Sequence, residues 1–351
     1  MFIRNAWYVA AWGDEIQDGQ ILARRICNDP LVLFRAGDGL VAALEDRCCH
    51  RAAPLRFGRV TEGCLQCGYH GLTFDRHGKC VRIPAQDLIP ERACVRSYPT
   101  VERDALVWIW MGDANKADES TIPSFPYHND EANWPHRHQV IHVKANNMLL
   151  VDNLMDLTHI GFVHGRTIGG NEEMHARAQT KVTRAESGLS FIRWMLDSEP
   201  PTTYRRLYDF EGTVDRWQEF EFVPPSNIIQ WSGAMKSGRG ATENRNQDNT
   251  FSFRIFHGLT PETESSCYYF WSGCNGYEPD DPAATEMLFS ELARTFAEDK
   301  DIVEGQQERL TERGEQGLVA VASDAARLHM RRIEQRLLAE EAVNNQVRST
   351  T

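Results

Sequence analysis

Two cysteine–histidine pairs within residues 48–70 limit what this chain can fold into and bind more than any other feature of its sequence. They read Cys48-x-His50 and, sixteen residues later, Cys67-x2-His70. Two thiolates and two imidazoles presented by two loops suit a [2Fe–2S] cluster in which histidines replace cysteines on one iron. The cysteines would then hold one iron and the histidines the other. Glycines and Pro54 within the segment permit the tight loops that this arrangement needs.

A zinc site is the alternative interpretation of the same segment. Cys64 and Cys67 form a C-x2-C pair that is typical of zinc sites, and Cys48 or Cys49 could extend it. The CxH…CxxH pairing, with both histidines in register, is far more specific and favours the cluster. Cys49 and Cys64 are then left over, and we expect both to be small core residues.

Charge and cysteine content narrow the class of protein. Nine cysteines, an odd number, without an evident export signal favour reduced thiols over a disulfide framework. The net charge of −12 argues against nucleic-acid binding, because phosphate contacts require clustered Lys and Arg. No run approaches the roughly 18 apolar residues of a membrane helix, and the N-terminal apolar stretch is too short for a signal peptide. We therefore expect a cytoplasmic protein that binds no membrane.

A polar, proline-containing stretch from Gly112 to Pro126 is interpreted as a linker between two domains. Before it, short strands at 31–35, 40–45 and 105–111 alternate with turn residues, which predicts an all-β domain over residues 1–115. After it, residues 116–351 show a helical stretch near 145–165, a strand-rich middle over 180–275 and two C-terminal helices. The first of these helices should begin near Asp281-Pro282, and the second should cover 322–342. The chain has no GxGxxG, no phosphate-binding loop and no ferredoxin spacing, so it lacks its own reductase.

A second candidate metal site lies in the run DNLMDLTHIGFVH over residues 152–164. His159 and His164 are five residues apart, which a regular helix would place about 140° apart. Both can face one metal only if the helix ends or bulges, and Gly161 between them allows that. Asp156 lies on the same helical face as His159, where its carboxylate could orient that imidazole. Taken alone, such a pair is more often two hydrogen-bonded core histidines.

A third ligand is needed to turn the histidine pair into a site. One stripe of the predicted C-terminal helix repeats at i, i+4, i+7 and i+11, through Leu292, Phe296, Asp299 and Val303. Asp299 is the one charge in the stripe, whereas Glu298 lies off it and Asp301 opposite it, where we expect both to be solvated. A buried carboxylate needs a cationic partner, which either a metal or an arginine could supply. Two histidines and one carboxylate form the triad of non-haem Fe(II) oxygenases.

Together these motifs resemble those of the oxygenase components of Rieske non-haem iron oxygenases. The resemblance runs along nearly the whole chain, through NAWYVAAW (5–12), RCCHRAAPL (47–55), CGYHGLTF (67–74), VWIWMGD (107–113), VDNLMDLTH (151–159), DRWQ (215–218) and FAEDKDIVE (296–304). The compact chain is similar to the single-subunit monooxygenase and demethylase branch. The resemblance implies an α+β fold, with an N-terminal all-β Rieske domain and a C-terminal helix-grip-like catalytic domain whose antiparallel sheet has flanking helices.

The resemblance also implies an activity and its cofactors. The expected reaction is hydroxylation of a methyl or methoxy carbon of an aromatic acid with O2, which is O-demethylation in the methoxy case, within aromatic compound catabolism. The [2Fe–2S] cluster would be held by Cys48, His50, Cys67 and His70. Mononuclear Fe(II) would be held by His159, His164 and Asp299, with Asn153 close to the iron. Electrons would come from a separate ferredoxin-type reductase that carries FMN and uses NAD(P)H.

The same family implies a homotrimer in which the cluster of one subunit serves the iron of its neighbour. Asp156 would bridge the two centres, bonding His159 of its own chain and His70 of the next. Substrate contacts are expected in the strand-rich middle, where the candidates are His257, Trp231 and Trp271, each more often a core residue. The residue that binds the substrate's anion stays open among Arg193, Arg216, Arg254 and Lys236.

Two other functions compete with this interpretation. The first is a dioxygenase that adds both oxygen atoms to an aromatic ring as a cis-dihydrodiol. The second is a Rieske electron-transfer protein whose C-terminal domain only binds a ligand or partner. An electron carrier has no need of His159, His164 and Asp299, so the triad separates it from the enzymes.

Overall fold

The computed structural model describes residues 1–351 except 85, 171, 185–187, 246–249 and 350–351. Contacts within the chain define two compact units. The first comprises residues 1–124 with 260–264, and the second comprises 125–259 with 265–351. The domain boundary at residue 115 stays a prediction. In the described part of the chain, no helix has both the length and the apolar character to cross a bilayer.

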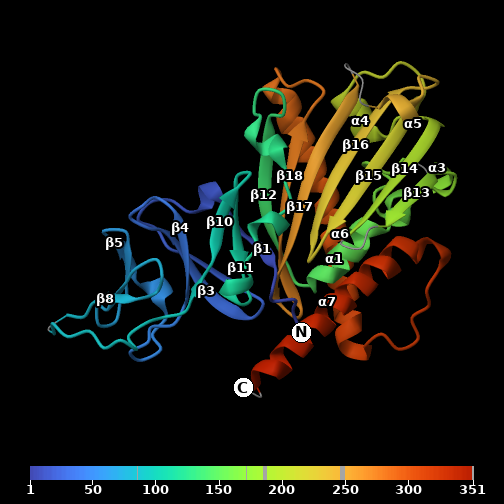
Figure 1. The fold of residues 1–351 in the computed structure, drawn as a ribbon. Helices are drawn as coiled ribbons and strands as arrows, with labels where there is room; N and C mark the ends of the chain where they lie inside the picture. Colours follow the sequence, from blue (N-terminus) through green and yellow to red (C-terminus); the bar gives the residue numbers. More distant parts are fainter. Residues whose placement is uncertain (85, 171, 185–187, 246–249, 350–351) are drawn as a thin grey trace. The chain divides into compact units, whose positions relative to one another are not determined.

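The first unit is built from short antiparallel strands in three sheets, which confirms the all-β prediction (Figure 1). One sheet has the order β1 (Trp7–Trp12), β11 (Leu106–Trp110) and β10 (Thr100–Arg103). Another has the order β2 (Leu22–Ile26), β3 (Asp29–Arg35), β4 (Val41–Glu45) and β9 (Ser97–Tyr98). The third has the order β5 (Arg59–Thr61), β6 (Cys64–Gln66), β7 (Thr73–Phe74) and β8 (Cys80–Arg82).

Burial explains why these strands form where they do. Every residue of β1 and of β11 is buried, so both read as continuous runs of aromatic, β-branched and small residues rather than as alternating ones. The same unit also contains four short 3₁₀ turns, at Gly13–Glu15, Leu55–Phe57, Ala114–Lys116 and Glu119–Thr121. The two cysteine–histidine loops come directly after β4 and between β6 and β7.

The second unit is a seven-stranded antiparallel sheet with helices packed against it (Figure 1). Its order is β12 (His136–Val143), β18 (Ser266–Asn275), β17 (Phe251–Thr263), β16 (Asn227–Lys236), β15 (Val214–Val223), β14 (Leu189–Ser198) and β13 (Gln179–Arg184). The strands from β13 to β18 are sequential neighbours, and β12 is added at the β18 edge. The sheet therefore agrees with the predicted antiparallel sheet and strand-rich middle.

The longest helix begins where its sequence predicts. α6 (Pro282–Arg313) starts with Pro282, and the Asp281 carboxylate accepts a hydrogen bond from the Ala283 amide at 2.8 Å. α6 runs along one face of the sheet in Figure 1, and its Leu288, Leu292 and Phe296 join the apolar core of the unit. α7 (Ala325–Ser349) follows a 3₁₀ turn at Ala322–Asp324.

The helical stretch predicted over 145–165 consists of three pieces. Its main break lies before His159, whereas the sequence suggests an interruption at Gly161, which lies inside the third piece. α1 (Asn147–Met155) ends at Met155, a 3₁₀ turn covers Leu157–His159, and α2 (Ile160–Val163) follows. The shorter helical segments of this unit are the 3₁₀ turn Pro126–Asn129, α3 (Glu172–Ala176), α4 (Thr202–Leu207) and α5 (Ala241–Asn244). His159 ends the 3₁₀ turn and His164 caps the end of α2 with a non-helical backbone, so the two histidines described below do not lie on one regular helix.

Candidate metal centres and the adjoining pocket

The two cysteine–histidine loops share one hydrogen-bonding pattern. In the first, the Cys48 amide donates to Ala53 O at 2.9 Å and the Ala52 amide donates to Cys48 O at 3.0 Å. In the second, the Cys67 amide donates to Leu72 O at 2.8 Å and the Gly71 amide donates to Cys67 O at 3.1 Å. The fourth residue after each cysteine has a left-handed φ, +56° at Ala52 and +75° at Gly71. Each loop is thus a closed tight turn that starts at its cysteine.

Within these loops the thiols are buried and the imidazoles are exposed. Cys48 and Cys67 are 3% and 2% exposed, and burial, together with the Cys67 thiol beside it, raises the pKa of Cys48 to about 12. The rings of His50 and His70 lie at the surface with their centroids 4.6 Å apart. Two adjacent buried thiols and two adjacent imidazoles are the donor set that a mixed cysteine–histidine cluster requires.

The left-over cysteines differ from expectation. Cys49 is exposed and Cys64 is only partly buried, so the prediction that both are core residues is wrong. Successive residues of a tight turn point in different directions, and with Cys48 directed inward its neighbour Cys49 faces solvent.

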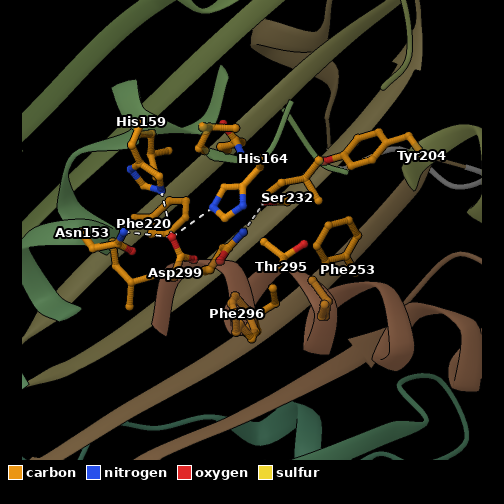
Figure 2. Close-up of a pocket in the computed structure, with 18 residues that line it drawn as sticks. Asn153, His159, His164, Tyr204, Phe220, Ser232, Phe253, Thr295, Phe296 and Asp299 are labelled. Carbon is orange, nitrogen blue, oxygen red and sulfur yellow. Dashed lines mark hydrogen bonds and ion pairs between the residues drawn. The ribbon is translucent and has the colours of Figure 1, made fainter. Parts of the chain in front are cut away.

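The second candidate centre gathers residues that are up to 140 positions apart. Ligand atoms of His159, His164 and Asp299 all lie within 4.8 Å of one another. His164 Nε2 is 3.0 Å and His159 Nε2 is 3.4 Å from Asp299 Oδ1. Figure 2 shows the three side chains converging from the loop after α1 and from α6. Because His159 ends a 3₁₀ turn and His164 lies at the end of α2, the five-residue spacing departs from that of a regular helix and both imidazoles can face the same point.

Hydrogen bonds to the opposite ring nitrogens orient both imidazoles. His159 Nδ1 donates to the backbone oxygen of Asp156 at 2.6 Å, and His164 Nδ1 donates to Glu298 Oε2 at 2.7 Å. With each Nδ1 occupied as a donor, each Nε2 is the ring nitrogen that points at Asp299. An Nε2–H can donate to the carboxylate, and on losing that proton the same nitrogen becomes the one that a metal ion would bind.

The electrostatics of Asp299 agree with a cation site. Burial acts to raise the pKa of Asp299, but hydrogen bonds from His159 and His164 outweigh it and hold that pKa below its usual range. Asp299 is 4% exposed, and no arginine or lysine is paired with it among the described residues. A buried carboxylate with two imidazoles and no basic side chain fits a divalent metal ion.

Asn153 is the fourth residue at this centre. Its Nδ2 donates to Asp299 Oδ1 at 2.9 Å, while its own Oδ1 is buried without a hydrogen-bond partner in the described structure. A buried, unpaired carbonyl oxygen close to the three ligands is a second sign that a positively charged or donor group belongs here. The sequence-based placement of Asn153 near the metal is consistent with this geometry.

Two expectations about the surrounding carboxylates were wrong. Glu298 is not simply solvated, because it accepts hydrogen bonds from His164 Nδ1 and from Thr167 Oγ1 at 3.1 Å. The carboxylate of Asp156 does not bond His159 within the chain. It caps the following 3₁₀ turn instead, accepting from Thr158 N at 3.0 Å and Thr158 Oγ1 at 2.7 Å. Asp301 is exposed, as expected.

A pocket adjoins the triad, and its side chains are drawn in Figure 2. Its walls are mostly apolar: Leu154, Leu157, Ile160, Ile168, Phe220, Phe253, Ile255, Leu292 and Phe296. Its polar members, apart from the triad and Asn153, are Tyr204, Gln218, Gln230, Ser232 and Thr295. Among the described residues, neither lysine nor arginine lines it. An apolar chamber with a few polar groups suits an aromatic ring.

The three residues predicted from sequence to contact substrate lie outside the lining of this pocket, as far as the chain is described. His257 is fully buried and bonds Tyr269 and Gln230. Trp271 packs on Phe296 with ring centroids 4.9 Å apart. Trp231 pairs across strands with Arg254, on the face of the sheet opposite to Ser232. A contact between any of them and substrate stays a prediction.

Sequence reasoning missed Gln218, Gln230 and Ser232 in the pocket. Strand alternation could have found them, because residues 214, 216, 218, 220 and 222 of β15 share one face. Gln218 is a polar residue on a face that also carries Phe220 and Phe222, and such a residue on an otherwise apolar face indicates a candidate pocket contact. Glu298 was missed because its partner His164 is 134 residues away in the sequence.

Comparisons with known proteins agree with both centres. Residues 6–99 match the Rieske [2Fe-2S] domain, and residues 143–340 match the C-terminal domain of the vanillate O-demethylase oxygenase. The chain is 38% identical over 342 residues to the iron–sulfur subunit of the toluene-4-sulfonate monooxygenase system of Comamonas testosteroni, covering 97% of this chain and 98% of that one. It is 36% identical over 348 residues to a vanillate O-demethylase oxygenase subunit of a Pseudomonas species, covering 97% and 96%.

A solved structure extends the agreement to three dimensions. The crystal structure of dicamba monooxygenase with non-haem iron and dicamba is 34% identical, with a TM-score of 0.82. The match covers 98% of this chain and 99% of that one.

Proposed function

The chain belongs to the Rieske non-haem iron oxygenases, in the vanillate O-demethylase family, and from that premise we propose that it hydroxylates a methyl or methoxy carbon of an aromatic acid. As a member it is the oxygenase component of a monooxygenase, with a Rieske [2Fe–2S] cluster and a mononuclear iron as cofactors. The names of its relatives, toluene-4-sulfonate monooxygenase and vanillate O-demethylase, support the methyl and methoxy carbons as targets.

The proposed iron ligands come from the two groups of side chains described above, one in the cysteine–histidine loops and one around Asp299. Cys48 and Cys67 would bind one iron of the Rieske cluster, and His50 and His70 the other. His159, His164 and Asp299 would bind the mononuclear iron. The observation that carries this proposal is the convergence of two Nε2 atoms on one buried carboxylate, with both Nδ1 atoms already donating elsewhere. That arrangement has no purpose in an electron carrier.

When bound, the mononuclear iron would supply the activation of dioxygen, since a triad of this kind leaves coordination positions open. The protein itself does the remaining work. Glu298 and the Asp156 carbonyl hold the imidazoles in orientation, and Asn153 holds the carboxylate through its N–H. The apolar walls around Phe220, Ile255 and Phe296 exclude water and fix the plane of an aromatic ring beside the triad.

The overall reaction of a methoxy substrate accounts for all atoms. One oxygen atom enters a C–H bond of the methyl group, and the other leaves as water with two electrons and two protons. The product is a hemiacetal, whose C–O bond breaks to give a phenol and formaldehyde. A methyl substrate stops at the benzylic alcohol, because no oxygen is present on the ring side of the carbon to act as leaving group.

Electrons would come from a separate reductase. The absence of flavin-, nucleotide- and ferredoxin-binding motifs in the sequence supports a partner that carries FMN and uses NAD(P)H. A homotrimer in which Asp156 joins the two centres is part of the same proposal: its backbone oxygen holds His159, and its carboxylate would bond His70 of the next subunit. The second oxygen of the Asp156 carboxylate supports it, because the capping bonds use only Oδ1.

Turnover of a panel of methyl- and methoxy-substituted benzoates and benzenesulfonates, with a surrogate reductase, tests the proposal. We expect benzylic alcohol from methyl substrates, or formaldehyde in step with substrate loss from methoxy substrates. Protein that has both iron centres filled and reduced, yet converts no member of the panel, would support the electron-carrier function instead.

A further inference from the structure

Gln218 has a buried polar side chain for which the structure offers no partner. It is 3% exposed and lines the pocket, and its amide oxygen has no hydrogen bond within the described chain. A glutamine amide rotates about its last bond and can present either its NH2 donors or its carbonyl to a ligand. Burying such a group unpaired is costly, so a ligand that completes it is expected.

Ser232 lies directly across the strand pair from Gln218 and presents a hydrogen-bond donor. A chain of bonds sets its direction: Tyr269 OH donates to His257 Nδ1 at 2.7 Å, and His257 Nε2 donates to Gln230 Oε1 at 2.9 Å. Gln230 Nε2 then donates to Ser232 Oγ at 2.7 Å. Burial lowers the pKa of His257 to about 3, so the ring is neutral and donates through one nitrogen only. The Ser232 hydroxyl hydrogen is therefore left to donate into the pocket.

Two buried guanidinium groups lie next to these donors. Arg193 pairs with Gln218 across β14 and β15, and Arg216 precedes Gln218 by two residues on the same face of β15. Arg193 donates to Leu157 O and His175 O, both at 2.7 Å, and Arg216 donates to Ile168 O at 3.2 Å. Burial and the nearby Arg216 charge lower the pKa of Arg193 to about 10.

Neither cation has a carboxylate in direct contact within the described residues, where no ion pair with Arg193 or Arg216 is formed. The nearby Asp156 charge nevertheless acts on Arg193 and partly offsets the effect of burial on its pKa. They hold the backbone of Leu157 and Ile168, which are pocket residues, so they stand directly behind the wall. Two buried positive charges beside two neutral donors favour a negative ligand group over a neutral one.

We infer that Gln218 and Ser232 bind the carboxylate or sulfonate group of the substrate, with Arg193 and Arg216 supplying the positive potential behind them. This inference rests on the proposed function and assigns the anion contact within the same pocket. His257 becomes a positioning residue that orients Gln230 and Ser232. Of the four basic residues considered from the sequence, Lys236 and Arg254 are excluded from this role. Lys236 is exposed, and Arg254 stacks on Trp231 on the other face of the sheet.

The test compares acids with uncharged analogues of the same shape. Dissociation constants are measured by calorimetry on the oxidised holoenzyme for a panel of methyl- and methoxy-substituted benzoates and benzenesulfonates, each beside its carboxamide or sulfonamide. For Gln218→Leu we expect acids to bind about tenfold or more weakly, because a charge-assisted hydrogen bond is lost, and amides to change less than about twofold. Gln218→Glu, which preserves shape, should weaken acid binding about a hundredfold through like-charge repulsion and still bind amides.

Thr295→Val is the matched control, because Thr295 lines the same pocket but already donates its hydroxyl to Glu291 O at 3.0 Å. It should leave the ratio of acid to amide affinity as in the wild type. Unchanged ratios in both Gln218 variants, with the Rieske spectrum and the melting temperature retained, would overturn the assignment of Gln218. Wild-type protein that binds no acid of the panel would instead contradict the proposed function.

Discussion

Asp299 and Asp301 differ by one half-turn of α6, and that difference defines a matched pair of variants. Asp299 faces the two histidines and is buried, whereas Asp301 is exposed. We expect about three iron atoms per wild-type chain, two in the cluster and one at the triad. In Asp299→Ala the iron content should fall to about two atoms per chain while the visible spectrum of the Rieske centre is kept. In Asp301→Ala all three iron atoms should remain. Full iron content and activity in Asp299→Ala would show that another carboxylate is the ligand.

Glu298 tests whether the orientation of His164 matters for iron affinity. Removing this carboxylate in Glu298→Ala leaves His164 Nδ1 without its acceptor and frees the ring to turn. We expect iron to bind roughly 10- to 100-fold more weakly in competition with a chelator, with Glu298→Gln in between. Glu308→Ala, at an exposed position of the same helix, serves as the control. Equal iron affinity in Glu298→Ala and Glu308→Ala would contradict the positioning role.

At this scale the sequence selects candidate ligands more readily than the residues that orient them. The CxH…CxxH spacing and the apolar stripe around Asp299 are local patterns, so single residues could be selected from them. Glu298 could not be selected, because its role is to accept a hydrogen bond from His164, which lies near it only in the folded chain. The same holds for Gln218, whose proposed role in anion binding depends on its cross-strand neighbours Arg193 and Ser232.

The cluster-binding loops show how an element depends on one glycine. Gly71 has φ +75°, and a Cβ there would lie 2.9 Å from the Pro84 ring, whereas Gly39 has φ +81° and nothing within 4 Å of a Cβ. Both alanine variants carry the cost of a left-handed backbone, about 1 kcal/mol. Only Gly71→Ala adds a collision inside a ligand loop. We expect reduced acid-labile sulfide per chain in Gly71→Ala and full sulfide with a small loss of melting temperature in Gly39→Ala; equal sulfide in both would contradict this.

Element boundaries were predictable where a local signal marks them. Asp281 and Pro282 begin α6 because a carboxylate cap and a proline at the first position both favour a helix start. The interruption after Met155 was not predicted, because the sequence suggested a break at Gly161, between the two histidines. Its stabilising contact, the Asp156 carboxylate on Thr158 N, is local but was assigned to His159 instead.

Asp156 is the residue that we propose connects the site to a neighbouring subunit. Asp156→Asn keeps a side chain that caps the 3₁₀ turn and keeps the backbone oxygen that holds His159, so both metal centres should stay filled. The change removes the charge proposed to link the two centres between subunits, and we expect turnover to stop. The cluster is reduced, then mixed with substrate and oxygen. Rapid reoxidation with product formation in the variant would refute the bridging role.

The α+β class and the all-β first domain follow from strand periodicity, but the order of the large sheet does not. Placing β12 beside β18 joins segments about 130 residues apart, and no local pattern encodes such a pairing. Residues 260–264 group with the first unit through backbone bonds such as Cys27 N to Pro261 O at 2.9 Å. Pairings of this kind depend on tertiary packing, which a single sequence does not display.

The fate of isotope-labelled dioxygen tests the central claim most directly, because it reports the reaction itself. With a methyl-substituted aromatic acid, a reductase and labelled O2, we expect a benzylic alcohol that carries one labelled atom. With a methoxy-substituted acid we expect formaldehyde that carries one labelled atom when trapped at once, and a phenol that keeps its original oxygen. A cis-dihydrodiol with both labelled atoms as the main product would contradict the proposed monooxygenase reaction.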